Sequence, residues 1–273
     1  MDMKKLLMPD FTLTDQLTSE QLELFDRYGA IIFRNFITKE KVQAYLGEIT
    51  RLEKEWLDEG KEKVNGIPLK FGKDEHGNRT IQRLCFASLH SQLLHGLLSD
   101  SRLNALLELV KPYEGRIGEN EKDGLVVNNY INTPNSAFSQ MGWHTDSPRD
   151  LFLGQRIMPM LNVGIHLDDC PIENGGLRIL PGTHKQGMLK LLFKKKYFVD
   201  HKADSREVGF DIKSGDLTVH DGRLWHRVQQ SPHYGEKSRR RVMYIPVVTG
   251  KYMPKDKNSK TPFYHKFAST VQN

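Results

Sequence analysis

The sequence predicts an α+β fold in which helices near the N-terminus pack against the major sheet of an antiparallel β structure. Apolar residues recur at helical spacing before residue 111, whereas short apolar runs separated by Gly, Pro, Asn and Asp dominate after residue 120. This second part holds about eight expected strands, and their connections are too short for crossover helices. The pattern therefore favours a jelly roll over a parallel α/β sheet.

The N-terminal part, residues 1–120, is expected to be mostly helical. Thr18 and Gln21 form a capping box at the start of the first helix, and Thr38 is the predicted N-cap of the second. Apolar residues at helical spacing make both helices amphipathic. The expected elements of this part are a helix at 18–29, a strand at 30–33, a helix at 38–57, two strands around an exposed turn at 73–78, and helices at 90–98 and 101–110.

Residues 121–250 are expected to form the jelly-roll core, and residues 251–273 a C-terminal tail of the same single domain. The clearest alternation lies between Met160 and Leu167, where Asn162, Gly164 and His166 form the more polar face. Such alternation is typical of a strand in an antiparallel sheet. Strands are expected at 125–131, around 142–146, and at 160–167, 177–180, 208–212, 217–220, 224–229 and 241–248.

Composition limits the class of protein. No apolar run of the 273 residues approaches the roughly 20 residues that span a bilayer, and the first residues do not resemble a secretory signal. Cys85 and Cys170 are expected to be reduced thiols in a cytoplasmic protein. The net charge of +6 favours an anionic small-molecule substrate. No nucleic-acid-binding motif accompanies the basic runs, so we expect no nucleic acid, no membrane, and a monomer or homodimer.

The segment Gly142-Trp143-His144-Thr145-Asp146 contains two candidate metal ligands. If it is a strand, His144 and Asp146 point the same way, because side chains two apart share a face. A second histidine would complete a facial triad, which leaves open positions on iron. His226 is the best candidate because it precedes an arginine-bearing strand that could anchor a 2-oxoacid. The alternatives are His166, His184, His201, His220, His233 and His265.

Three blocks of the sequence resemble the phytanoyl-CoA dioxygenase family of Fe(II)/2-oxoglutarate oxygenases. They are Trp143-His144-Thr145-Asp146, the segment 173–184 with its Asn-Gly-Gly-Leu and Pro-Gly-Thr-His motifs, and the segment from Gly215-Asp216 through His226 to Arg240-Arg241-Val242. The opening Tyr28-Gly29-Ala30-Ile31-Ile32 is similar too. The resemblance implies a cupin-like double-stranded β-helix that uses Fe(II), 2-oxoglutarate and O₂.

The resemblance also implies a role for particular residues. Iron would be held by His144, Asp146 and His226, with no catalytic residue beyond these ligands. Arg240 would anchor 2-oxoglutarate, although the spacing leaves Arg239 and Arg241 open, and Asn129 would lie near the co-substrate. Val228 replaces the small hydroxyl residue that many members carry. The candidate substrate contacts are His166, Arg178, Arg223 and Trp143.

The expected activity is hydroxylation of an unactivated C–H bond in a small carboxylate-bearing or amino-acid-like metabolite or natural-product intermediate. Asp146 argues against a halogenase, in which a small residue replaces the carboxylate. Desaturation, cyclisation or epimerisation on the same scaffold is the main alternative, and a non-catalytic cupin-like binding protein is a further one. The segment 188–204 lies where the family often carries a variable loop, and it is either a lid or a surface insertion.

Overall fold

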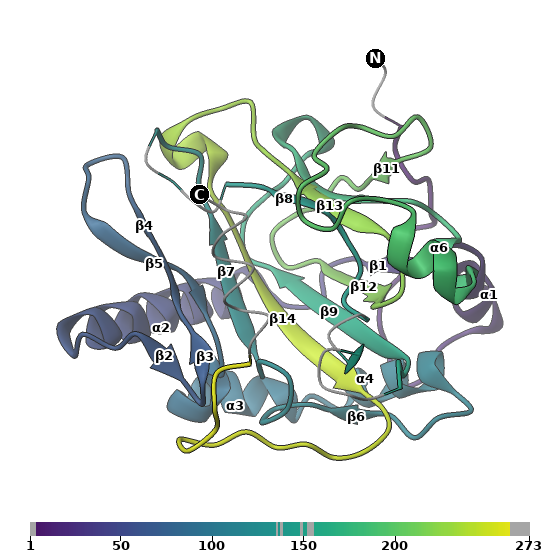
Figure 1. Cartoon of the computed structure of the whole chain (residues 1–273), viewed down its shortest axis with the longest axis horizontal. Helices are drawn as coiled ribbons and strands as arrows, with labels where there is room; N and C mark the ends of the chain where they lie inside the picture. Colours follow the sequence, from purple (N-terminus) through teal and green to yellow (C-terminus); the bar gives the residue numbers. More distant parts are fainter. Residues whose placement is uncertain (1–3, 135, 137–138, 148–149, 152–155, 263–273) are drawn as a thin grey trace.

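The computed structural model describes residues 4–134, 136, 139–147, 150–151 and 156–262. Two antiparallel sheets form its β part (Figure 1). The larger sheet has the order β1-β12-β9-β14-β7-β5-β4, with β6 paired to β14, and the smaller sheet has the order β11-β10-β13-β8. The strands are β1 Ala30–Phe33, β4 Lys70–Lys73, β5 Arg79–Leu84, β6 Arg116–Ile117, β7 Val126–Tyr130, β8 Met141–His144, β9 Met160–His166, β10 Gly176–Ile179, β11 Val208–Gly209, β12 Leu217–Asp221, β13 His226–Gln229 and β14 Arg240–Val248, besides the small hairpin of β2 Lys63–Val64 and β3 Ile67–Pro68.

The chain passes back and forth between the two sheets. From β7 to β14 the strands β7, β9, β12 and β14 join the larger sheet, while β8, β10, β11 and β13 join the smaller one. All of the strand pairs named here are antiparallel. The mixed helix and sheet composition with antiparallel sheets is as predicted, and the order of the strands is consistent with a jelly roll.

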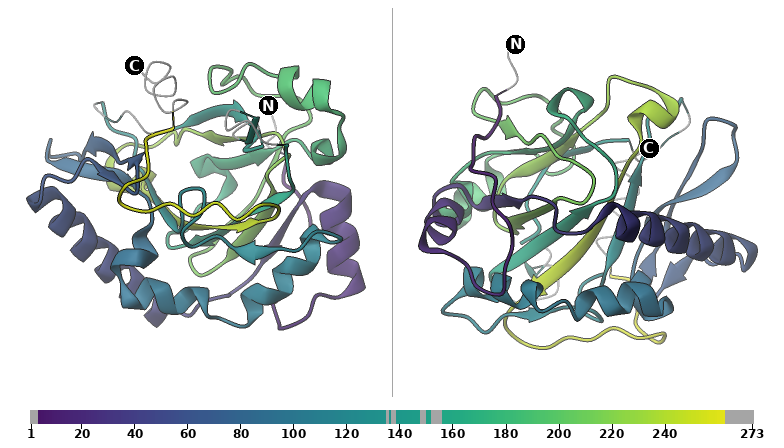
Figure 2. Two further views of the ribbon diagram at one scale, coloured as in Figure 1. Left: turned by 60° about the horizontal axis from the view of Figure 1, so that its bottom comes forward. Right: turned by 180° about the vertical axis from the view of Figure 1, so that it is seen from behind.

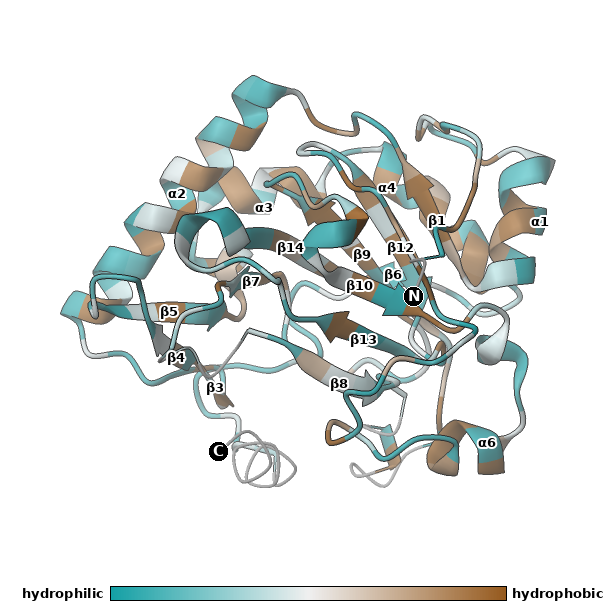
Figure 3. Cartoon of the chain, turned by 90° about the horizontal axis from the view of Figure 1, so that it is seen from above, coloured by the Kyte–Doolittle hydropathy of each residue, from teal (hydrophilic) through white to brown (hydrophobic). Residues whose placement is uncertain are grey.

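The N-terminal helices cover one face of the larger sheet (Figure 2). They are α1 Ser19–Tyr28, α2 Lys39–Asp58, α3 Gln92–Leu98 and α4 Arg102–Ala105; α6 Met188–Phe193 follows later in the chain, and short 3-10 helices lie at Ala87–His90, Leu106–Val110, Ile172–Asn174, Thr183–Lys185 and Gly235–Ser238. Along α2, hydrophilic and hydrophobic residues alternate, as expected of a helix that buries one side (Figure 3). The predicted placement of the helices is thus confirmed.

The first two helices begin where their caps were predicted. The Thr18 hydroxyl accepts from the Gln21 amide at 3.2 Å, and the Gln21 side chain accepts from the Thr18 amide at 2.9 Å. Gly29 ends this helix with a φ of 75°, which favours glycine. The Thr38 hydroxyl caps α2 through the Lys41 amide.

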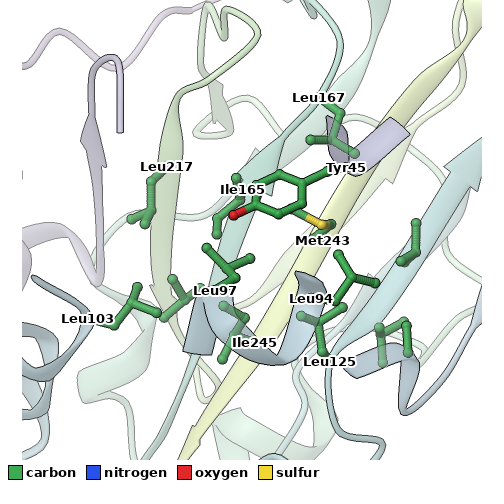
Figure 4. Close-up of a cluster of buried hydrophobic side chains, with 14 of the residues drawn as sticks. Tyr45, Leu94, Leu97, Leu103, Leu125, Ile165, Leu167, Leu217, Met243 and Ile245 are labelled. Carbon is green, nitrogen blue, oxygen red and sulfur yellow. The ribbon is translucent and has the colours of Figure 1, made fainter. Parts of the chain in front are cut away.

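A continuous hydrophobic core joins the helices to the larger sheet (Figure 4). Tyr45 of α2 and Leu94 of α3 lie there among Ile165 of β9 and Met243 of β14. Burial of each such side chain contributes about 1.5–3 kcal/mol. Because the apolar face of β9 packs on the helices, its polar face must turn toward the smaller sheet.

Several elements differ from their predicted bounds. The predicted helix at 101–110 is the short α4 followed by a 3-10 helix, and β11 has two residues. Strand β8 ends at His144, so Asp146 lies beyond it. Both cysteines are free and buried. In the described part of the chain, no helix combines the length and apolar character needed to cross a bilayer.

Candidate metal centre

Two histidines of the smaller sheet and one aspartate that follows its strand β8 converge at one point. His144 of β8 and His226 of β13 are paired in register, and their ring centroids are 4.1 Å apart. The Asp146 Oδ2 lies 3.6 Å from the Nε2 of His226. One potential ligand atom from each residue falls within 4.8 Å of the others. The structure thus brings together the three residues that the sequence selected.

Asp146 reaches this point by a different route from the one predicted. It follows the end of β8, and its amide donates to the Gly222 carbonyl at 2.8 Å. The condition that both residues lie on one strand is therefore not met, because the strand ends at His144. The two side chains nevertheless converge, as expected.

Both imidazoles are oriented by the backbone. The Nδ1 of His144 lies 2.8 Å from the Gly142 carbonyl, and the Nδ1 of His226 lies 3.0 Å from the Leu224 carbonyl. A carbonyl can only accept, so each Nδ1 carries the proton and each Nε2 is left as an acceptor. Burial, with the nearby His226, lowers the pKa of His144 to about 3, so this imidazole is neutral near pH 7.

Asn162 holds the carboxylate from the opposite sheet. Its Nδ2 donates to the Asp146 Oδ2 at 2.6 Å and lies 3.3 Å from the Nε2 of His220. His220 is close to the group, with its ring 4.6 Å from that of His226, but it is outside the converging triad. His184, His201 and His233 also lie outside this triad, and His265 falls beyond the described residues.

The donor set fits a metal that keeps open positions. Two imidazoles and one carboxylate form the facial triad of non-haem Fe(II) sites. The triad borders a cavity of about 130 Å³ between the two sheets. Besides the triad, the cavity is lined by Arg83, Lys122, Asp123, Gly124, Val126, Asn128, Tyr130, Met141, Met160, Asn162, Leu177, His220, Val228, Tyr244 and Pro246.

The three consecutive arginines have different partners. Arg239 pairs with Glu236, and Arg241 binds Asp168 through two hydrogen bonds of 2.6 and 2.8 Å. Arg240 is buried at 6% exposure and has no carboxylate partner among the residues that the structure describes. Burying an uncompensated guanidinium is unfavourable, so this site suits an anionic ligand.

The local contacts of Arg240 leave room for that ligand. Its Nη1 donates to the Gln229 carbonyl at 2.9 Å and its Nη2 to the Ser139 carbonyl at 3.3 Å. Its buried Nε has no hydrogen-bond partner within the described chain. The guanidinium lies 5.5 Å from the ring centroid of Tyr130, which also lines the metal cavity. Arg240 therefore fits the role of an anchor for a dicarboxylate.

Asn129 is not on the cavity side of β7. Its Oδ1 accepts from the Nη1 of Arg239 at 2.9 Å, and Val127, two residues earlier, belongs to the core beneath the helices. The neighbouring Asn128 lines the cavity instead. The structure therefore does not support Asn129 as a co-substrate contact, because a shift of one residue along a strand changes the face.

Three of the four predicted substrate contacts are engaged elsewhere. Arg178 donates to the carbonyls of Ile172 and Gly175, and Arg223 binds Asp221 through both side-chain oxygens. Trp143 is fully buried. None of the three is among the described residues that line the cavity beside the triad, and their role as substrate contacts stays a prediction.

His166 does lie on the inner face. Its Nε2 is 2.9 Å from the Thr218 hydroxyl, and it lines a smaller cavity together with Arg240. Burial lowers its pKa to about 3. His166 is thus a neutral residue that lines the smaller cavity beside Arg240, and it is not among the described residues that line the cavity beside the triad.

The segment 188–204 lies directly against β8. The Phe198 ring stacks on His144, with centroids 4.9 Å apart and planes at 27°. The Phe198 amide donates to the Trp143 carbonyl at 2.9 Å, and the Tyr197 hydroxyl lies 2.7 Å from that of Thr145. The segment therefore packs on the strand that carries a candidate ligand, and whether it acts as a lid or is a surface insertion stays open as a prediction.

Several cavity residues were missed from the sequence. Asn162 had been placed on the polar face of its strand, but without a role. No local sequence pattern marked Arg83 and Lys122 as cavity residues. They reach the cavity through strand pairing and a loop conformation, which depend on residues distant in the sequence.

The fold has two antiparallel sheets, and two histidines and one carboxylate line the cavity between them. This arrangement is typical of mononuclear non-haem iron proteins with a facial triad. The family model described as Phytanoyl-CoA dioxygenase matches residues 25–240, and the chain belongs to this family of Fe(II)/2-oxoglutarate-dependent oxygenases. The resemblance stated from the sequence motifs is thereby confirmed.

Individual relatives are distant. The ectoine dioxygenase of Bordetella parapertussis (strain 12822 / ATCC BAA-587 / NCTC 13253) is 25% identical over 175 residues, which are 63% of this chain and 51% of the relative. This chain spans about half the length of the curated relatives it matches.

Solved structures show the same fold. The carbocyclase SnoK from nogalamycin biosynthesis has a TM-score of 0.65 at 16% identity, covering 94% of this chain and 93% of that one. HygX from Streptomyces hygroscopicus, solved with nickel and 2-oxoglutarate bound, has a TM-score of 0.59 at 18% identity, covering 87% and 89%. At these identities the likeness concerns the fold alone.

Proposed function

We propose that this protein is an Fe(II)/2-oxoglutarate-dependent dioxygenase that hydroxylates an unactivated C–H bond of a small carboxylate-bearing or amino-acid-like molecule. The observation that carries the proposal is the convergence of His144, Asp146 and His226, with both Nε2 atoms available, at the edge of a cavity. We also infer that the two sheets form the predicted double-stranded β-helix, which the order of strands supports.

The residues present fit the implied groups. His144, Asp146 and His226 would hold Fe(II), and Arg240 would hold the distal carboxylate of 2-oxoglutarate. When bound, iron, 2-oxoglutarate and O₂ together supply the oxidising power, with succinate and CO₂ as co-products and one oxygen atom passing to the substrate. The retained carboxylate of Asp146 favours this outcome over halogenation.

The chain itself supplies position and exclusion of water. The backbone carbonyls of Gly142 and Leu224 fix the imidazoles, and Asn162 fixes the carboxylate. Val228 lines the cavity where many relatives have a hydroxyl, so this position adds apolar surface and no hydrogen bond. An apolar, closed environment protects a strongly oxidising reaction from side reactions.

The test is 2-oxoglutarate turnover by the purified protein reconstituted with Fe(II). We expect succinate release that depends on a pool of small carboxylic acids, amino acids and acyl thioesters, and that His144→Ala abolishes. A second variant, Arg240→Met, tests the proposed anchor for 2-oxoglutarate. Its matched control is Arg239→Met, since Arg239 pairs with surface Glu236. A protein that binds no Fe(II) and releases no succinate with any pool would contradict the proposal.

Product mass separates the possible outcomes. Hydroxylation adds one oxygen atom, desaturation or cyclisation removes two hydrogen atoms, and epimerisation leaves the mass unchanged. The fold is shared with a carbocyclase, so the product mass is the measurement that decides whether the proposed hydroxylation takes place.

A further inference from the structure

Two basic side chains line the metal cavity on the side of the larger sheet. Arg83 lies on β5 and is in register with Asn128 of β7, which also lines the cavity. Leu84, the next residue on β5, belongs to the core beneath the helices, so alternation turns Arg83 toward the cavity. Lys122 reaches the same cavity from the loop before β7.

Both cations belong to largely buried ion pairs. The Arg83 Nη2 lies 2.6 Å from the Asp123 Oδ2, with side-chain exposures of 15% and 7%. Lys122 pairs with Asp150, with exposures of 19% and 6%. A buried ion pair adds little net stability, because desolvation offsets the attraction. Two such pairs beside one cavity are therefore better explained by binding than by folding.

The backbone conformation points to the same place. Lys122 has a φ of 56°, in the left-handed region that residues with a Cβ rarely adopt, and Gly124 follows with a φ of 61°. Holding a non-glycine residue in this region costs on the order of 1 kcal/mol. Strained residues of this kind cluster at ligand sites, where the surrounding structure imposes them.

Arg83 retains hydrogen-bonding capacity beyond Asp123. A guanidinium carries five N–H donors. In the described part of the chain, the hydrogen bond of Arg83 is made by Nη2, to Asp123, so its other nitrogens can donate to a ligand. Lys70, opposite Arg83 on β4, adds positive charge nearby, and burial together with Arg83 lowers its pKa to about 8. The region can thus accept a further carboxylate.

We propose that Arg83 and Lys122 form the subsite that binds the carboxylate of the organic substrate, in place of the arginines expected from the sequence. This inference rests on the proposed function, because the subsite and the iron triad share one cavity. Asp123 lies beside the same subsite and would favour an amino group next to that carboxylate. The preferred substrate is then an amino-acid-like molecule.

The experiment measures binding without turnover. Protein loaded with Zn(II) and 2-oxoglutarate is examined by saturation-transfer NMR with matched acids and amides: L-proline and L-prolinamide, L-leucine and L-leucinamide, pentanoic acid and pentanamide. We expect the acids to bind at least about tenfold more tightly than the amides, the effect of roughly one charge-assisted hydrogen bond. The affinity for 2-oxoglutarate is measured separately by calorimetry.

The variants separate binding from folding. Arg83→Met/Asp123→Asn removes both partners of the pair and avoids leaving a lone buried charge, whereas Arg83→Lys keeps the positive charge. The double variant should lose the preference for acids, and Arg83→Lys should retain part of it. Arg79→Met is the matched control on the same strand, since Arg79 is half exposed and pairs with Glu62.

The outcomes are distinct. Loss of the acid preference with unchanged 2-oxoglutarate affinity supports the subsite. Equal binding of acids and amides by the wild type, or binding of neither, overturns it. Weaker 2-oxoglutarate binding in the double variant also overturns it, because Arg83 would then serve the co-substrate. Failure of the wild type to bind 2-oxoglutarate would instead contradict the proposed function.

Discussion

Replacing Asn162 by leucine should weaken metal binding, although Asn162 is not a candidate ligand. Its amide donates to the Asp146 carboxylate at 2.6 Å and lies farther, at 3.3 Å, from the Nε2 of His220. A hydrogen bond to a charged group contributes about 1.5–3 kcal/mol. Without it the carboxylate can rotate away from His144 and His226, so we expect the metal affinity to fall by about 10- to 100-fold, as for other outer partners of metal ligands.

The assay is a titration of the apoprotein with Co(II), which replaces Fe(II) without oxidising in air. Calorimetry gives the affinity, and the visible absorption of Co(II) reports any change in coordination. Thr218→Val is the matched control, because Thr218 is buried on the neighbouring strand and contacts His166 rather than Asp146. It should lower stability slightly and leave Co(II) affinity unchanged.

Two results would refute the role given to Asn162. If Asn162→Leu unfolds at the same denaturant concentration as the wild type and binds Co(II) with the same affinity and spectrum, the hydrogen bond does not position Asp146. If Thr218→Val weakens Co(II) binding equally, the effect belongs to packing of the inner face and not to Asn162.

Three further predictions follow from the same geometry. Arg240→Met should weaken 2-oxoglutarate binding to the Co(II) protein by about 10- to 100-fold, measured by calorimetry, because Arg239 and Arg241 are paired with carboxylates whereas Arg240 has no carboxylate partner among the described residues; an unchanged affinity excludes it as the anchor. Phe198→Ala should speed metal loss to a chelator without changing the unfolding midpoint, since it uncovers His144; equal rates would show that Phe198 does not cover the site. His166 has a folded pKa of about 3 against an ordinary 6.5, so the unfolded chain binds its proton first and stability falls as the pH drops through this window. His166→Asn should therefore reduce the loss of unfolding free energy between pH 7 and pH 5 by about 2 kcal/mol in urea titrations, and an unchanged loss would show that His166 is not buried as a neutral group.

The walls of the two cavities contain both neutral and charged groups. Burial lowers the pKa of His144, His166 and His220 to about 3, so these imidazoles carry no charge at neutral pH. Charge in the two cavities is then concentrated on carboxylates, Arg and Lys. This arrangement suits a divalent metal at one point and carboxylates at others.

Local signals in the sequence determined the elements and the ligand types. Capping at Thr18 and Thr38, the alternation around Ile165, and the spacing of His144 and Asp146 depend on residues only a few positions apart. His226 could be selected because it precedes the arginine strand. The family resemblance pointed to Arg240 as the anchor, but the sequence left Arg239 and Arg241 open, and this role remains a prediction.

Only the tertiary structure decided which partner each polar side chain takes. Arg178 and Arg223 could have faced a substrate, but each finds buried acceptors nearby, and Asn129 is turned away by the pairing of β7. Arg83 faces the metal cavity because β5 pairs with β7, and Lys122 reaches it from the loop before β7, where its backbone is left-handed. The physical reason is that helix and strand periods are short-range properties, whereas the partner of a buried charge depends on segments brought together from distant parts of the chain. The sequence by itself determined an iron-type donor set, and the folded chain decided what surrounds it.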